Sequence, residues 1–395
     1  MEKVHLVSTA PAGPEAGLFA SAFRSRSLTP LTFHLSTLIA LLLSAGLTFD
    51  SARAAPLGFD SIYVFGDSFA DVGNHSRLTG GEIPSPPYFE GRFANGPIWV
   101  DHLAEKAGLT LKPSETGFDP ASDRAVSFGY GGAGTGAENF SPARVLVPGL
   151  QGQVANFRSA LGDAGTTADP DALYILAVGS NDYLLNVTSG PAQTVGNIAT
   201  AIEQLADAGA RNFLVPNLPD LGMTPAVVAG GVSEFFTALT LGHNQLLAAT
   251  LSDLEAARPG IDIASPDVFG LFETILANPE AFGFSSSIAA GPASGCIFPP
   301  FICRPVGETD TFFWDEVHPT TEVHRLLADA AQEAMAVPEP PVALLIGTGL
   351  VAIGVARTLS LSRLRERAAT PSGRRSPLGA KGRDGIEPTD AADCR

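Results

Sequence analysis

A serine stands between two acids directly after an apolar run, in "IYVFGDSFADVGN" (62–74). The apolar residues 62–65 predict a buried strand, and Ser68 lies where that strand gives way to a turn. A serine hydroxyl is a weak nucleophile, so it needs a general base and a group that orients the base. Without those partners the segment is only a turn, and the rest of the chain has to supply them.

A base and an orienting acid stand together near the end of the chain, in "WDEVHPT" (314–320). His318 can accept the serine proton, and Asp315 can bind the other ring nitrogen and so fix the tautomer. Pro319 favours an extended geometry at His318, just before a predicted helix. Taken alone, the segment also fits a helix cap beside a chance histidine.

A tetrahedral oxyanion needs hydrogen-bond donors as well. The segments "GYGGAG" and "GSND" each follow an apolar run and supply small or amide-bearing residues. We expect the donors to be the amide of Ser68, the amide of Gly132 or Gly131, and the side chain of Asn181. The sequence alone leaves the choice between the two glycines open.

Three other chemistries fit the sequence less well. "GYGGAG" satisfies the dinucleotide-binding spacing through Gly129, Gly131 and Gly134, but Pro142 and Pro148 follow where an uninterrupted helix is required. No G-x-S-x-G occurs, so the nucleophile elbow of α/β-hydrolases is missing. No C-x-x-C or His/Cys cluster predicts a metal site, and we expect no cofactor.

The elements that must position these residues alternate along the chain. Expected strands are 61–65, 125–128, 172–178, 212–216 and 261–265, and expected helices are 95–108, 152–162, 192–209, 232–260 and 321–335. Continuously apolar strands that alternate with helices indicate a parallel sheet covered on both faces. We therefore predict an α/β fold, a flavodoxin-like three-layer α/β/α sandwich with about five parallel strands. Three of the polar segments then follow strands, at the edge where open parallel sheets bind ligands.

These segments, in this order, resemble the GDSL family of lipases and esterases within the SGNH hydrolase superfamily. The similar blocks are "FGDSFADVGN", "GRFANGPIWVD", "VSFGYGGAG", "GSND" and "FWDEVHPT", and the resemblance covers roughly residues 60–335. Phe69 replaces the usual leucine, and Ser127 stands where an asparagine is common. The resemblance implies a catalytic triad of Ser68 as nucleophile, His318 as base and Asp315 as the orienting acid.

The same resemblance implies an oxyanion hole made by Ser68, Gly132 (or Gly131) and Asn181. Around it we expect Asp71 and Asn74 to cap the helix after Ser68, and Asp182 to brace the loop of Asn181. His243 and His324 are expected to be surface groups or satisfied core groups. Six aromatic residues either line an acyl pocket or pack in the core: Phe89, Phe93, Trp99, Phe312, Phe313 and Trp314.

The two ends of the chain resemble export and sorting signals. Residues 35–48 are apolar, follow basic residues and precede the small-residue sequence "SARAAP", which predicts a signal peptide over 1–54. An uncleaved N-terminal anchor is the alternative. Residues 337–367 combine Val-Pro-Glu-Pro, a short apolar run and an arginine cluster, resembling a PEP-CTERM sorting signal read by a membrane peptidase. A plain anchor helix is the alternative there, and 368–395 is expected to be disordered.

The hydrolase domain is thus expected over 55–336, in a protein at the periplasm, outer surface or matrix of a Gram-negative bacterium. Such a compartment is oxidising, and a Cys296–Cys303 disulfide is expected in "GCIFPPFICR", with two free thiols as the alternative. The chain carries 24 Lys and Arg against 41 Asp and Glu, a net charge of -17. This charge argues against a nucleic-acid partner.

The sequence therefore predicts an exported serine esterase that forms an acyl-enzyme on Ser68. Its substrate is expected to be a lipid or short-chain acyl ester, or an acetyl ester on a polysaccharide. A binding protein of the cell surface or matrix, built on the same scaffold without catalysis, is the alternative from another functional class.

Overall fold

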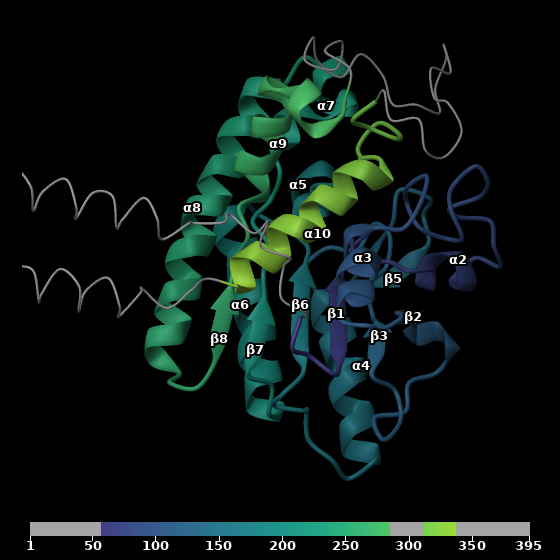
Figure 1. The fold of residues 1–395 in the computed structure, drawn as a ribbon, viewed down its shortest axis with the longest axis vertical. Helices are drawn as coiled ribbons and strands as arrows, with labels where there is room; N and C mark the ends of the chain where they lie inside the picture. The colour runs from purple at the N-terminus through teal and green to yellow at the C-terminus, as the bar shows by residue number, and fades with distance from the viewer. Residues whose placement is uncertain (1–56, 285–310, 337–395) are drawn as a thin grey trace, which may run out of the picture. The chain divides into compact units, whose positions relative to one another are not determined.

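The computed structural model describes residues 57–284 and 311–336 of the 395-residue chain (Figure 1). The predicted signal peptide (1–54) and the Cys296–Cys303 disulfide lie outside the described residues. The predicted sorting signal (337–367) and the tail (368–395) lie outside them as well. Among the helices of the described ranges, none combines the length and apolarity needed to cross a membrane.

Six parallel strands form the central sheet in the order β2-β3-β1-β6-β7-β8. Their bounds are β1 Ile62–Gly66, β2 Lys112–Pro113, β3 Ala125–Ser127, β6 Leu173–Ala177, β7 Asn212–Leu214 and β8 Asp262–Ala264. The predicted fold class is confirmed, with one strand more than the five expected. The additional strand, β2, is a two-residue edge strand, too short to leave a hydrophobic pattern.

The strand order places a topological switch beside β1. The chain enters the sheet at β1, pairs Ile62 with Ala125 of β3 on one side, and later pairs it with Leu173 of β6 on the other. Loops that leave β1 and β6 therefore diverge to opposite sides at their carboxyl ends. Such a divergence opens the crevice in which open α/β sheets bind ligands.

The long helices lie where the periodicity predicts them. Their bounds are α3 Trp99–Lys106, α4 Leu150–Asp163, α6 Pro191–Ala208, α8 Ser233–Ala257 and α10 Thr321–Met335. The helix expected after Ser68 is α2, Asn74–Leu78. Other short elements were not predicted: α5 Ser180–Leu184, α7 Pro225–Ala229, the 3₁₀ turns η1 Ser114–Thr116, η2 Leu221–Met223 and η3 Pro279–Phe282, and the antiparallel hairpin of β4 Glu138–Phe140 and β5 Leu146–Pro148. Helix α9, Val268–Ala277, was also missed, although its buried residues Val268, Phe269, Phe272 and Ile275 recur at helical spacing.

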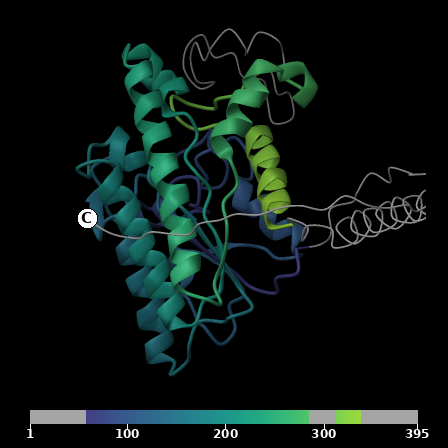
Figure 2. The same ribbon diagram turned by 90° about the vertical axis from the view of Figure 1, so that its left-hand side faces the viewer.

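Side chains of β1 alternate between two hydrophobic cores, as the pleat of a strand requires. Ile62 and Val64 belong to the core with α3, α9 and α10, whereas Tyr63 and Phe65 belong to the core with α4, α6 and α8. Every residue of β1 is buried. Figures 1 and 2 show α10 covering one face of the sheet and α6 and α8 the other. Because β1 is fixed on both faces, the turn that follows it has a rigid base.

Candidate active site

Ser68, His318 and Asp315 meet beyond the carboxyl end of β1. The Nε2 atom of His318 lies 2.7 Å from the Oγ atom of Ser68, and its Nδ1 atom lies 2.6 Å from Oδ2 of Asp315. Ser68 and Asp315 are 8% and 5% exposed, so the chain of hydrogen bonds is shielded from bulk water. The structure thus brings together three side chains that are separated by up to 250 positions in sequence.

Asp315 is held as an ionised acceptor. Its Oδ1 atom accepts the amides of Val317 (2.8 Å) and His318 (2.7 Å), and its Oδ2 atom also accepts the hydroxyl of Tyr88 at 2.8 Å. Burial raises the pKa of this carboxyl, but the His318 ring and the hydrogen bonds outweigh it, so the pKa lies below its usual value. A carboxylate can only accept, so Nδ1 of His318 carries the proton and Nε2 is left to accept from Ser68.

Tyr88 was not singled out in the sequence. It lies 227 positions from Asp315, in the connection between α2 and α3. No local pattern marks it, because only the tertiary fold brings its hydroxyl to the carboxylate.

The turn that carries His318 is closed by its own hydrogen bonds and anchored on both sides. The amide of Trp314 donates to the carbonyl of His318 at 2.7 Å, and Phe313 forms an isolated bridge with Pro319. The hydroxyl of Thr320, at the start of α10, donates to the carbonyl of Thr311 at 3.1 Å. These bonds restrict movement of the His318 turn away from Ser68.

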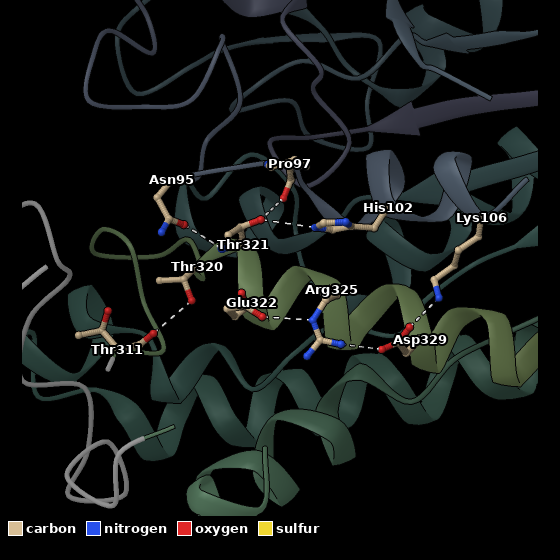
Figure 3. A network of polar contacts seen from close by, with 10 residues as sticks. All are labelled: Asn95, Pro97, His102, Lys106, Thr311, Thr320, Thr321, Glu322, Arg325 and Asp329. Atoms are coloured by element: carbon tan, nitrogen blue, oxygen red, sulfur yellow. Dashed lines mark hydrogen bonds and ion pairs between the residues drawn. The ribbon is translucent and has the colours of Figure 1, made fainter. Parts of the chain in front are cut away.

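Helix α10, which begins directly after this turn, is docked by polar contacts onto α3 and the segment before it (Figure 3). Thr321 donates its amide to Asn95 Oδ1 at 2.8 Å and its hydroxyl to the carbonyl of Pro97 at 2.7 Å. Lys106 of α3 forms an ion pair with Asp329 at 2.7 Å. Since "GRFANGPIWVD" supplies Asn95 and Pro97, this block of the sequence fixes the position of the start of α10.

The open question between Gly131 and Gly132 has a structural answer. The amide of Gly131 donates to Oδ2 of the buried Asp71 at 2.8 Å. For the amides of Gly132 and Ser68, no acceptor lies within hydrogen-bond distance among the described residues. A side chain at Gly132 would be strained by its φ of 79° and would bring Cβ to 2.7 Å from Cβ of Ser141. The geometry therefore favours Gly132, with Ser68, as an amide donor to a ligand.

Asn181 follows β6, at the start of α5. Its Nδ2 atom donates one hydrogen to the carbonyl of Ala133 at 3.0 Å, and a side-chain amide has a second hydrogen to give. Asp182 beside it accepts the amide of Thr135 at 2.9 Å and the hydroxyl of Thr194 at 3.3 Å. The structure thus shows Asp182 tying the Asn181 segment to the glycine-rich loop and to α6.

Asp71 and Asn74 connect the loop after Ser68 to the glycine-rich loop. Asp71 accepts the amides of Gly73, Asn74 and His75 at the start of α2, besides that of Gly131. Burial raises its pKa to about 6, although the four amides act in the opposite direction. Asn74 donates to the carbonyl of Ser127, the last residue of β3, and to that of Gly129 in the glycine-rich loop that follows β3. Asp71 therefore accepts the amides at the start of α2 as expected, whereas Asn74 does not cap the helix and instead links two walls of the site.

A cavity of about 150 Å³ opens beside Ser68 and His318. Most of its lining is apolar and comes from segments far apart in sequence: Phe69, Ile83, Phe93, Leu184, Leu221, Phe272, Phe313 and Val317. Of the six aromatic candidates, Phe93 and Phe313 lie in this lining. Trp99 and Phe312 pack in the core, Trp314 is buried beside Tyr88, and Phe89 does not line the cavity.

The histidines expected outside the site are core residues with incomplete hydrogen bonding. Nδ1 of His243 lies 2.7 Å from the Tyr183 hydroxyl, but its Nε2 and the Nδ1 of His324 have no partner in the described part of the chain. Burial lowers the pKa of His243 to about 4 and that of His324 to about 3. Buried His75 lines the cavity and was not predicted. Within 57–284 and 311–336, no group of three or more His, Cys, Asp or Glu side chains could hold a metal ion.

Residues 62–331 match the family model of GDSL-like lipases and acylhydrolases. The chain belongs to this family. The match spans every strand of the central sheet. It also includes Ser68, Asn181, Asp315 and His318. The GDSL family consists of lipases and acylhydrolases, so the chain is a hydrolase that acts on ester bonds.

Curated relatives extend the likeness over most of the GDSL chain. A phosphatidylcholine-sterol acyltransferase of Aeromonas hydrophila is 29% identical over 336 residues, 74% of this chain and 95% of the relative. A GDSL esterase/lipase of Arabidopsis thaliana is 26% identical, and the alignment covers 70% of this chain and 89% of the relative. Among solved structures, an acetylxylan esterase from Geobacillus stearothermophilus aligns with a TM-score of 0.39 and 10% identity, over 72% of this chain and 98% of its own. This last likeness is too distant to bear on the substrate.

Proposed function

We propose that this chain is an exported serine esterase in which Ser68 is the nucleophile, His318 the general base and Asp315 the acid that orients it. The unbroken hydrogen-bond chain from Ser68 Oγ through His318 to Asp315 Oδ2 is the observation that carries this proposal. It ends beside two amides, of Ser68 and Gly132, that have no acceptor among the described residues.

In the first half of the reaction, Ser68 Oγ attacks the ester carbonyl carbon and its proton passes to His318 Nε2. The carbonyl oxygen becomes an oxyanion and accepts hydrogen bonds from the amides of Ser68 and Gly132 and from Nδ2 of Asn181. The tetrahedral intermediate then collapses, His318 gives its proton to the departing alcohol, and the acyl group remains on Ser68. Asp315 stabilises the imidazolium while it exists.

In the second half, water replaces the alcohol. His318 takes a proton from the water, and the resulting hydroxide attacks the acyl carbonyl through a second oxyanion held by the same donors. His318 returns the proton to Ser68 Oγ as the carboxylic acid leaves. Each step uses groups that the chain itself supplies.

The cavity favours an acyl chain of several carbons over an acetyl group. Its volume is about 150 Å³, whereas a single water needs only about 10–15 Å³ by the same measure. The lining is mainly aliphatic and aromatic, so each buried methylene would contribute about 0.8 kcal/mol to binding. An acetyl ester on a polysaccharide would leave most of this surface unused. We therefore propose lipid-like or medium-chain acyl esters as the substrate class.

Acyl transfer to an alcohol is a second candidate, favoured by the relative named phosphatidylcholine-sterol acyltransferase, which this chain covers over 95% of its length. The acyl-enzyme is the same in both reactions, and only the group that attacks it differs. Adding a primary alcohol to the assay separates them, because a transferase would form the new ester at the expense of the free acid.

Export is part of the proposal and is supported by the apolar run at 35–48 with its following small residues. Cleavage there would leave a mature chain beginning near Ala55. Mass spectrometry of the protein purified from the outer fractions of producing cells would give that terminus. A chain recovered only from the cytoplasm with Met1 in place would contradict export.

The proposed chemistry is tested by labelling the full chain with a fluorophosphonate probe and measuring hydrolysis of p-nitrophenyl acetate and octanoate. Wild type should label and turn over, with the higher kcat/KM on octanoate, and Ser68→Ala should do neither. Ser61→Ala is the matched control, because Ser61 is also buried and lies directly before β1, at the other end of that strand.

Two results would change the proposal. A Ser68→Ala protein that retains labelling would place the nucleophile elsewhere. A folded wild type that neither labels nor hydrolyses either ester would contradict the proposed esterase activity. It would favour a surface-binding protein on this scaffold.

A further inference from the structure

Asp315 has a hydrogen-bond donor that the triad does not include. The Tyr88 hydroxyl donates to Oδ2 at 2.8 Å, the same oxygen that lies 2.6 Å from His318 Nδ1. We propose that Tyr88 is a positioning residue for the reaction, acting through Asp315 on His318. This inference rests on the proposed roles of Ser68, His318 and Asp315.

Tyr88 is fixed as a donor. Burial and the neighbouring Asp315 raise the pKa of its phenol well above the usual value, so the hydroxyl keeps its proton across the working range of an esterase. Its ring packs edge-on against Trp314, with ring centres 6.1 Å apart, and at a steep angle to Phe93 at 6.2 Å. These contacts hold the ring so that its hydroxyl meets the carboxylate.

The bond completes the fixation of the carboxylate. Two backbone amides hold Oδ1 of Asp315, so without Tyr88 the other oxygen would be held by His318 alone. Because Oδ2 shares its electron density between two donors, it attracts the His318 proton less strongly. Tyr88 therefore fixes Oδ2 of Asp315 in place, and through it the orientation of the His318 ring toward Ser68.

The loop that carries Tyr88 also forms part of the substrate cavity. Ile83 and Phe93 of the same connection line the cavity, and the Phe93 ring lies 5.2 Å from the His318 ring, centre to centre. A substrate that fills the cavity thus contacts the segment that positions Asp315. The same segment is joined to α3 through the ion pair of Arg92 and Asp101 at 3.0 Å.

The test is the pH dependence of kcat/KM for Tyr88→Phe in the full chain, with p-nitrophenyl octanoate as substrate. The variant loses only the hydroxyl, so we expect the pH profile to differ from that of wild type, because the hydrogen bonding of the Asp315–His318 pair changes. At pH 7 we expect kcat to fall by roughly 3- to 10-fold, with KM little changed. The downfield proton resonance of His318 Nδ1–H should also shift, a change that loss of packing alone would not produce.

Tyr174→Phe is the matched control, because it removes another buried tyrosine hydroxyl, bonded to the Asp169 carbonyl at 2.9 Å and remote from the triad. Its profile should superimpose on that of wild type. If the Tyr88→Phe profile also superimposes while Tyr88→Leu is impaired, only the ring matters and the positioning role is wrong. In that case the proposed function still stands, provided that wild type turns over and Ser68→Ala does not. A wild type without turnover would overturn both proposals.

Discussion

At the scale of single residues, two buried aspartates of the site have opposite protonation tendencies, and their surroundings explain the difference. Asp315 has four donors on its two oxygens, one of them the imidazole of His318, and its pKa lies below the usual value. Asp67, next to Ser68, accepts only the amide of Phe69 among the described contacts, and burial raises its pKa to about 7. Two carboxyl groups whose pKa values are shifted in opposite directions are suited to different roles. Asp315 is suited to hold a charge beside His318, whereas Asp67 is suited to pack the turn.

The oxyanion donors give the first prediction at this scale. Asn181→Ala should lower kcat by about 10²-fold with little change in KM, because the amide is used mainly when negative charge develops on the carbonyl oxygen. Asn181→Asp, of nearly equal size, should be at least as impaired, since a carboxylate donates no hydrogen bond. Steady-state kinetics on the octanoate ester, with thermal unfolding as the folding check, would measure this. A decrease in kcat of less than threefold, with an unchanged unfolding temperature, would show that Asn181 is not an oxyanion donor.

At the scale of elements, the sequence predicts the positions of the polar residues better than the walls around them. Ser68, Asn181 and His318 stand in short polar segments between periodic ones, so their places at the ends of elements follow from the pattern. Leu184 and Leu221 belong to the short α5 and η2. Five or fewer residues cannot display a helical period. Phe272 belongs to α9, whose period is visible but does not reveal that the helix lies against the site. The cavity lining is therefore a property of tertiary packing that the sequence pattern does not reveal.

One of these short elements supplies a test of the acyl pocket. Leu184, half-buried at the end of α5, lines the cavity, so Leu184→Trp should fill part of it. We expect the octanoate-to-acetate ratio of kcat/KM to fall by about 10-fold or more, equivalent to excluding two or more methylenes. Leu185→Trp is the control, because the adjacent Leu185 is also half-buried and does not line the cavity. Equal ratios in Leu184→Trp and wild type would mean that the acyl chain lies elsewhere.

At the scale of the whole molecule, four buried titratable groups make the stability of the fold depend on pH. Burial raises the pKa of Asp67 and Asp71, so these groups favour the folded state toward acid pH, as protons bind to the folded form first. Burial lowers the pKa of His243 and His324, so these groups act in the opposite direction. The pH dependence of the free energy of unfolding is the sum of both. Only a comparison of variants isolates one contribution, since the aspartates cancel in the difference.

His324 is suited to that comparison. It is 1% exposed on α10, its ring lies 5.3 Å from that of Phe69, and burial, with His318 and His102 adding to it, lowers its pKa to about 3. Between the usual histidine value and that pKa, the unfolded chain binds a proton that the folded chain does not. This contribution to stability is therefore complete above about pH 6.5 and is lost as the pH falls below it.

His324→Leu removes this titration. Between pH 7 and pH 4.5 the variant should lose about 2 kcal/mol less of its free energy of unfolding than wild type does. At pH 7 the change itself should be small, because the buried Nδ1 atom that it removes has no partner among the described residues. Urea unfolding of both full-length proteins at five or six pH values would measure the difference. Parallel curves would show that His324 takes up a proton in the folded protein, through an opening of the core between α10 and the loop of Ser68.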